Sequence, residues 1–163
     1  MLSYKMDNSS LIIDIERGDY YNAKKKMKQI KFLEFKNLLF DYTHINENNN
    51  ILKFLKYLLK KEKSKKKLVK LYLLASGIVE SPPYLYKLKN AYKLSLIYLR
   101  KALRLDPSNI VVKSCILFLY GSPGVNLKEK EIEIIAKEVL EQESKNKIAK
   151  KALDYLEGKA KNK

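Results

Sequence analysis

Residues 92–109 read YKLSLIYLRKALRLDPSN, and this stretch carries the strongest structural signal in the sequence. From position 91 to 105, apolar residues recur at spacings of three and four, which is the pattern of an amphipathic helix. The segment DPSN at 106–109 predicts the end of this helix, because proline cannot donate to a helix ladder and restricts the residue before it. Asn109 is then in place to cap a following helix over 109–120.

The same helical period runs through the rest of the chain, and no segment alternates with a period of two over the length of a strand. Five glycines and four prolines are also too few for the many turns of an all-β fold. The sequence therefore predicts an all-α fold. The other predicted helices lie at about 11–15, 19–30, 33–43, 50–64, 68–79, 127–143 and 146–158, with a charged link at 62–67.

Within the quoted stretch, one aromatic and two small residues stand at fixed intervals. Tyr92 is followed after three positions by Ser95, and Ala102 comes seven positions after that. Small side chains at these places let two helices approach closely, and Pro107 then ends the helix before the next one starts. This spacing resembles the second helix of a tetratricopeptide repeat, in which the same pattern precedes Leu-x-Leu-Asp-Pro-x-Asn.

Two further places agree with this resemblance. Tyr120 falls where the family favours tyrosine, and residues 138–146 parallel residues 101–109 with Ser144 in the place of the proline. Residues between and beyond these places match the family by helical period. The alternative is an unrelated right-handed α-helical bundle that uses an Asp-Pro-x-Asn turn.

The resemblance implies a single domain over residues 1–163, built as a right-handed superhelix of antiparallel helix pairs. Insertions at 80–90 and 121–126 depart from the family pattern. The implied units are helix pairs at 9–30, 33–64, 68–105 and 109–143, a C-terminal capping helix at 146–158 that keeps the end of the stack solvated, and a frayed tail at 159–163.

The chain carries 34 Lys and Arg against 18 Asp and Glu, a formal net charge of +16, and all but three of the cations are lysine. At 46% hydrophobic residues, composition nevertheless excludes a disordered chain. The single cysteine, Cys115, excludes a disulfide-built secreted scaffold, and its apolar neighbours predict a small buried hydrophobe. The N-terminus lacks the apolar core of a signal peptide, and no apolar run is long enough to span a bilayer. We therefore expect a soluble, intracellular, cytoplasmic protein.

Residues that carry chemistry are scarce. His44 is the only histidine, and together with one cysteine it cannot supply the four ligands of a His/Cys zinc site. Neither Gly-x-Ser-x-Gly nor a glycine-rich phosphate loop occurs. Glu129, Glu131 and Glu133 fan around a helix and predict a solvated face. We predict no catalytic residue, no metal, no cofactor and no enzymatic activity.

In tetratricopeptide arrays the first helix of each pair lines a concave groove. The residues at such places here are apolar, aromatic or small, whereas the family's clamp for C-terminal carboxylates uses Lys, Asn and Arg. The resemblance thus implies a protein-interaction adaptor that binds a peptide or an amphipathic helix. An alternative is that Tyr72 and Phe118 belong to the core between repeats. The groove candidates are Val69, Tyr72, Ser76, Val111, Ser114 and Phe118.

Basic side chains offer a second candidate surface, because stacked helices could align their lysines into one stripe that binds RNA, DNA or another polyanion. Only three arginines are available for base recognition, and a charged helix face is usually solvated. A third candidate is the segment 81–86, whose tyrosines could anchor a partner or fold back over the helix at 68–79. The basic-surface candidates are Lys24, Lys28, Lys53, Lys56, Lys60, Lys93, Arg100 and Arg104.

Overall fold

The computed structural model describes residues 3–45, 49–82 and 84–161. Ten helices are described there, and no residue of these ranges lies in a strand, which confirms the all-α class. The helices are α1 (Ser3–Arg17), α2 (Tyr20–Met27), α3 (Phe32–Ile45), α4 (Asn50–Lys61), α5 (Lys65–Glu80), α6 (Tyr84–Lys87), α7 (Ala91–Leu105), α8 (Ile110–Phe118), α9 (Glu129–Gln142) and α10 (Lys147–Lys161).

Helix α7 has the predicted boundaries, and the turn after it works as predicted. The Oδ1 atom of Asn109 accepts a hydrogen bond from the backbone N–H of Val112 at 3.1 Å and so caps α8. The Nδ2 atom of Asn109 donates to Asp106 at 2.9 Å. Hydrogen bonds from Asn109 and Ser108 lower the pKa of the Asp106 carboxyl below its ordinary value. The short segment DPSN therefore ends one helix and starts the next.

Helix α1 is longer than the predicted stretch at 11–15, and it ends at a glycine. Gly18 has a φ of 77°. Its backbone N–H donates to the carbonyl of Ile15 at 3.1 Å, and the N–H of Asp19 donates to the carbonyl of Asp14 at 2.8 Å. This is the Schellman arrangement, which satisfies the last carbonyls of a helix and favours glycine at the left-handed position.

Two further predicted segments, the charged link and the tail, differ from the structure at their boundaries. The last three residues of the predicted link at 62–67 belong to α5, which begins at Lys65. The helix starts there because the Ser64 hydroxyl accepts a hydrogen bond from the backbone N–H of Lys67 at 3.4 Å and so caps it. The tail predicted to be frayed continues α10 as far as Lys161. Gly158 within it costs only about 1 kcal/mol of helix stability, and basic residues suit a helix C-terminus. Residues 162–163 lie outside the described residues.

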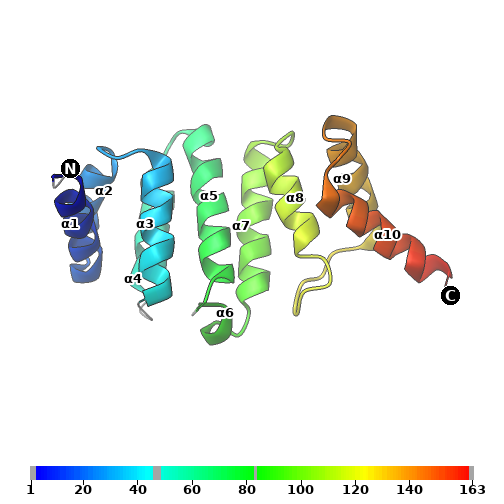
Figure 1. Ribbon diagram of the computed structural model, residues 1–163, viewed down its shortest axis with the longest axis horizontal. Coiled ribbons are helices and arrows are strands. Elements are labelled where there is room, and N and C mark those ends of the chain that lie inside the picture. Colours follow the sequence, from blue (N-terminus) through cyan, green and yellow to red (C-terminus); the bar gives the residue numbers. More distant parts are fainter. Residues whose placement is uncertain (1–2, 46–48, 83, 162–163) are drawn as a thin grey trace.

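The helices stand side by side along the long axis of the molecule in chain order (Figure 1). Helices α3, α5, α8 and α10 lie toward the viewer, with α4, α7 and α9 behind them. Neighbours in the chain pack on each other: α1 on α2, α5 on α7, α8 on α9 and α9 on α10. The predicted division into helix pairs stays a prediction. The right-handed superhelix of the tetratricopeptide type stays a prediction.

Two apolar cores lie on either side of the α5–α7 pair. Both helices supply residues to both cores. In the first core α5 places Leu74 and α7 places Tyr98. In the second core α5 places Val69 and α7 places Leu99. Burial of each large apolar side chain contributes about 1.5–3 kcal/mol. The first core includes Leu11, Ile15, Phe35, Leu39, Phe54, Leu58 and Ile78; the second includes Val112, Ile116, Ile132, Val139 and Ala149.

The insertion between α5 and α7 contributes to the first core. Tyr84 in α6 is 1% exposed, whereas Tyr86 is 79% exposed. Burial raises the pKa of Tyr84 to about 12. Of the two roles that the sequence left open for this segment, Tyr84 therefore takes the packing role, and Tyr86 alone presents an exposed ring.

Within the described ranges, no helix combines the length and the apolar character that a membrane crossing requires.

The raised pKa of Tyr84 predicts a loss of stability in alkali. Between about pH 10 and pH 12 the unfolded chain releases this proton while the folded chain keeps it, so the free energy of unfolding falls as the pH rises. A rise in pKa from 10 to about 12 corresponds to about 3 kcal/mol in the free energy of unfolding. Urea denaturation followed by circular dichroism measures the free energy of unfolding at each pH. Between pH 9 and 11.5 this free energy should fall less in Tyr84→Phe than in the wild type, by about 1–3 kcal/mol. Tyr86→Phe should follow the wild type; equal slopes for all three proteins would contradict the prediction.

Candidate functional site

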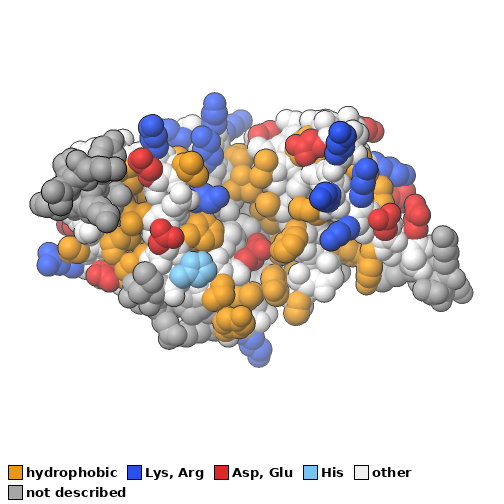
Figure 2. Space-filling view, in the orientation of Figure 1, with side chains coloured by type: hydrophobic (Ala, Val, Ile, Leu, Met, Phe, Trp, Pro, Cys, Tyr) orange, Lys and Arg blue, Asp and Glu red, His pale blue; other side chains and the backbone are white. Residues whose placement is uncertain are grey.

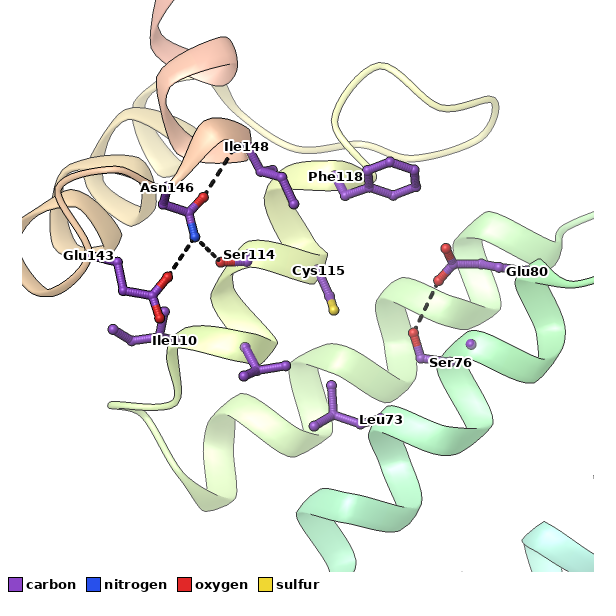
Figure 3. A pocket seen from close by; sticks show the side chains of 12 residues that line it. Leu73, Ser76, Glu80, Ile110, Ser114, Cys115, Phe118, Glu143, Asn146 and Ile148 are labelled. Carbon is purple, nitrogen blue, oxygen red and sulfur yellow. Dashed lines mark hydrogen bonds between the residues drawn. The ribbon is translucent and has the colours of Figure 1, made fainter. Parts of the chain in front are cut away.

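A groove of about 420 Å³ opens between α5 and α8 and reaches the start of α10 (Figure 3). We call it the α5–α8 groove. Four of the six groove residues predicted from the sequence line it, namely Ser76, Val111, Ser114 and Phe118. The complete lining is Leu73, Ser76, Gly77, Glu80, Ile110, Val111, Ser114, Cys115, Phe118, Glu143, Asn146 and Ile148.

Helix α8 presents apolar residues on two sides. One side, with Val112 and Ile116, is fully buried in the second core. The other side faces the groove, where Val111 remains 61% exposed and Phe118 remains 65% exposed. Positions 111, 114 and 118 share this side because they are spaced by three and four residues. Hydrophobic side chains also spread over this face of the molecule across α3, α5 and α8 in Figure 2. The groove wall is therefore an apolar helix face left without a cover.

The opposite wall is the last two turns of α5, where a hydrogen-bond network fixes an acidic side chain. The Ser76 hydroxyl lies 2.8 Å from the hydroxyl of Ser95 on α7 and donates to Glu80 Oε1 at 3.1 Å. The Ser95 hydroxyl also donates to Glu80 Oε1. Both serines are buried. The carboxylate of Glu80 is thus held at one position on the groove wall by two neutral donors.

A second network sets the far end of the groove, near α10. The Nδ2 atom of Asn146 donates to the Ser114 hydroxyl at 3.2 Å and to Glu143 Oε2 at 2.9 Å. Its Oδ1 atom accepts from the backbone N–H groups of Ile148 and Ala149, each at 3.1 Å. Asn146 therefore caps α10 and ties that helix to α8 (Figure 3).

The groove differs in charge from the chain as a whole. Its lining contains two glutamates, and no Lys or Arg of the described residues belongs to it, although 34 of the 163 residues are Lys or Arg. The negative charge reaches Cys115, whose pKa is raised first by burial and then by the charge of Glu80. A strongly basic protein therefore contains a locally acidic, mainly apolar groove.

The other two predicted groove residues lie elsewhere. Val69 is 5% exposed and belongs to the second core. Tyr72 packs against both cores, with its ring centroid 6.2 Å from that of Tyr98. The predicted register on α5 was off, because the helix turns positions 73, 76, 77 and 80 toward the groove instead of 69, 72 and 76. For Tyr72 the core alternative fits; Phe118, being exposed, is not a core residue.

Glu80, Asn146 and Cys115 also line the groove and were not predicted from the sequence. The spacing of Glu80 from Ser76, four positions on one helix, could have placed both on one face. The contact between Asn146 and Ser114 joins residues far apart in the chain, and no pattern in the sequence signals it.

The basic-surface candidates divide into two groups. Lys24 and Lys28 line a second hollow of about 520 Å³, together with Lys67 and Lys70, which were not predicted. We call this the basic hollow. Among the described residues, Glu62 is the one acidic side chain of its lining. The pKa of Glu62 is lowered first by the hydrogen bond from the backbone N–H of Ser64 and further by Lys67 and Lys24. The apolar lining is Met27, Ile30, Phe32, Phe35 and Leu71.

None of the remaining six basic candidates lines the α5–α8 groove or the basic hollow. They are exposed on two helices, and Arg100 is engaged in an ion pair with Glu131 at 3.1 Å. They are Lys53, Lys56 and Lys60 on α4, and Lys93, Arg100 and Arg104 on α7.

The described part of the chain contains no group of three His, Cys, Asp or Glu side chains that could hold a metal ion, and His44 is exposed. Comparisons with family models, with curated proteins and with solved structures found no match to this chain. The geometry of the groove and of the basic hollow therefore carries the functional argument.

The effect of Glu80 on Cys115 predicts a change in thiol reactivity. Glu80→Gln removes a negative charge, so the pKa of Cys115 falls toward its ordinary value while burial still holds it above. Cys115 is the only cysteine, so the rate of its alkylation by iodoacetamide between pH 7.5 and 9 measures this directly. The rate should rise in Glu80→Gln and stay unchanged in Glu143→Gln. An unchanged rate in Glu80→Gln would show that the carboxylate does not act on the thiol.

Proposed function

We propose that the protein is a non-enzymatic adaptor that binds a peptide or an amphipathic helix of a protein partner in the α5–α8 groove. The observation that carries this proposal is the uncovered apolar face of α8, with Val111 and Phe118 each more than 60% exposed. An apolar face of this kind, placed in a concave site with a few polar groups at its ends, is typical of peptide-binding surfaces.

The size of the groove supports the same proposal. At about 420 Å³ it accommodates a few side chains of a partner. Full burial of a large apolar side chain is worth about 1.5–3 kcal/mol, so contacts at Val111 and Phe118 would supply a substantial part of a micromolar affinity. We also propose a relation to tetratricopeptide arrays. Its support is the spacing of residues 92–120 and the packing of α5 on α7 and of α8 on α9.

Replacing the exposed apolar residues of the groove should abolish partner binding and leave the fold intact. In the double variant Val111→Ser/Phe118→Ser, proteins captured from a lysate of the source cells by wild type should be reduced about tenfold or more, since two anchors are lost. Leu33→Ser is the matched control, because Leu33 is 63% exposed on α3 and lies outside the groove lining. Quantitative mass spectrometry with and without nuclease measures the capture. Equal capture by the groove variant and the control would refute the proposal.

The basic hollow favours a second candidate function, the binding of RNA, DNA or another polyanion. Its specific support is one hollow that Lys24 of α2 and Lys28, directly after α2, line together with Lys67 and Lys70 of α5. An anion bound there would contact up to four lysines and one acidic group, Glu62. Such binding is driven by counterion release and weakens as salt rises.

A titration of labelled single-stranded RNA tests this second candidate. If four lysines contact phosphates, affinity should fall roughly fiftyfold between 50 and 200 mM salt. Lys24→Glu/Lys28→Glu should weaken binding strongly, whereas Lys93→Glu/Arg104→Glu, which changes the net charge equally, should weaken it little. Equal losses in the two variants would indicate unspecific attraction by the net charge, and no binding at 50 mM salt would exclude the candidate.

A further inference from the structure

We propose that the α5–α8 groove selects a partner segment in which a cationic side chain, Arg before Lys, accompanies a large apolar residue. Glu80 receives the cation, and the apolar residue packs on Val111 and Phe118. This inference rests on the proposed function and specifies the chemistry of the partner.

The first argument is the charge of the groove. With 34 Lys and Arg in the chain, a lining of twelve residues that contains two glutamates and no described Lys or Arg is opposite in sign to its surroundings. An acidic peptide or a nucleic acid would meet two carboxylates in this groove. A cationic side chain would meet complementary charge.

The second argument is the position of Glu80. Its carboxylate is anchored by Ser76 and Ser95, and both donors are neutral hydroxyls. In the described part of the chain, the ion pairs connect Lys26 with Asp14, Arg100 with Glu131, Lys113 with Glu138 and Lys137 with Glu133, and none reaches Glu80. Glu80 is half-buried and lines the groove. An incoming cation would therefore form a charge-assisted hydrogen bond that the chain itself does not provide.

The third argument is the ring of Phe118. It projects from α8 at the same end of the groove as Glu80, which extends from the opposite wall (Figure 3). A cation between them would contact a carboxylate on one side and the face of an aromatic ring on the other. The planar guanidinium of arginine satisfies both contacts better than the ammonium of lysine, because it stacks on rings and pairs with carboxylates in two-pronged geometry.

The net charge of the chain limits the number of cations in the partner. At +16 the protein repels a polybasic segment at long range, whereas a single cation gains the local attraction of Glu80. Salt screens the repulsion as well as the attraction. Binding in the groove should therefore depend only weakly on ionic strength, unlike the binding of a polyanion in the basic hollow.

The test is a selection of random twelve-residue peptides displayed on phage, carried out on the full chain. The immobilised proteins are wild type, Glu80→Gln, Val111→Ser/Phe118→Ser and the control Glu141→Gln, which removes the same charge from an exposed residue of α9 outside the groove lining. Wild type and Glu141→Gln should enrich peptides that combine Arg or Lys with a large apolar residue at a fixed separation. Glu80→Gln should keep the apolar preference and lose the cationic one. The double variant should enrich neither.

Fluorescence anisotropy with a synthetic copy of the most enriched peptide then measures the interaction between the peptide's cation and Glu80. Replacing the peptide's cationic residue with Gln should weaken binding to wild type about tenfold, the effect of one hydrogen bond to a charged group. The same replacement should change binding to Glu80→Gln little, because the partner of the cation is already gone.

The outcomes separate the inference from the proposed function. Peptides that require Val111 and Phe118 but show no cationic preference, or a preference that survives in Glu80→Gln, would overturn the inference and leave the adaptor proposal standing. Enrichment that does not depend on Val111 and Phe118, or no enrichment on wild type, would overturn the adaptor proposal and the inference together.

Discussion

The close contact between α5 and α7 is the interaction on which the rest of the structure depends. Small side chains make it possible: the hydroxyls of Ser76 and Ser95 lie 2.8 Å apart, and Ala75, Ala91 and Ala102 are buried on the same two helices. Because α5 and α7 both contribute to the two apolar cores, the position of each half of the molecule is set by this pair. A large residue in place of either serine would separate the helices and disturb both cores.

The same contact also creates the candidate site. Helix α8 packs on α7, and α7 packs on α5, so the wall of α5 and the wall of α8 face each other across a groove. The serines that join α5 to α7 also hold Glu80, so one small network serves both packing and the chemistry of the groove. The far end is set independently by Asn146, which joins α8 to α10.

Local patterns predicted the elements well, and contacts between distant residues account for most of what they missed. The period and the DPSN turn gave α7 and α8, because helix propensity, capping and proline act over a few residues. The register of α5 toward the groove was missed, since α5 carries apolar residues around most of its surface and its neighbours decide which side is covered. Val69 and Tyr72 do not line the groove for this reason, whereas Ser76, Val111, Ser114 and Phe118 do.

The division of the interior into two cores has a consequence for how the molecule opens. An array whose parts contact mainly their neighbours unfolds as separable units rather than as one. The α8 wall belongs to the second core and the α5 wall borders both, so partial opening of the C-terminal half removes the groove while the N-terminal core persists. A partner bound in the proposed groove would span this boundary. It would therefore add to the coupling that α5 and α7 already provide between the two cores, and ligand occupancy would make their opening more cooperative.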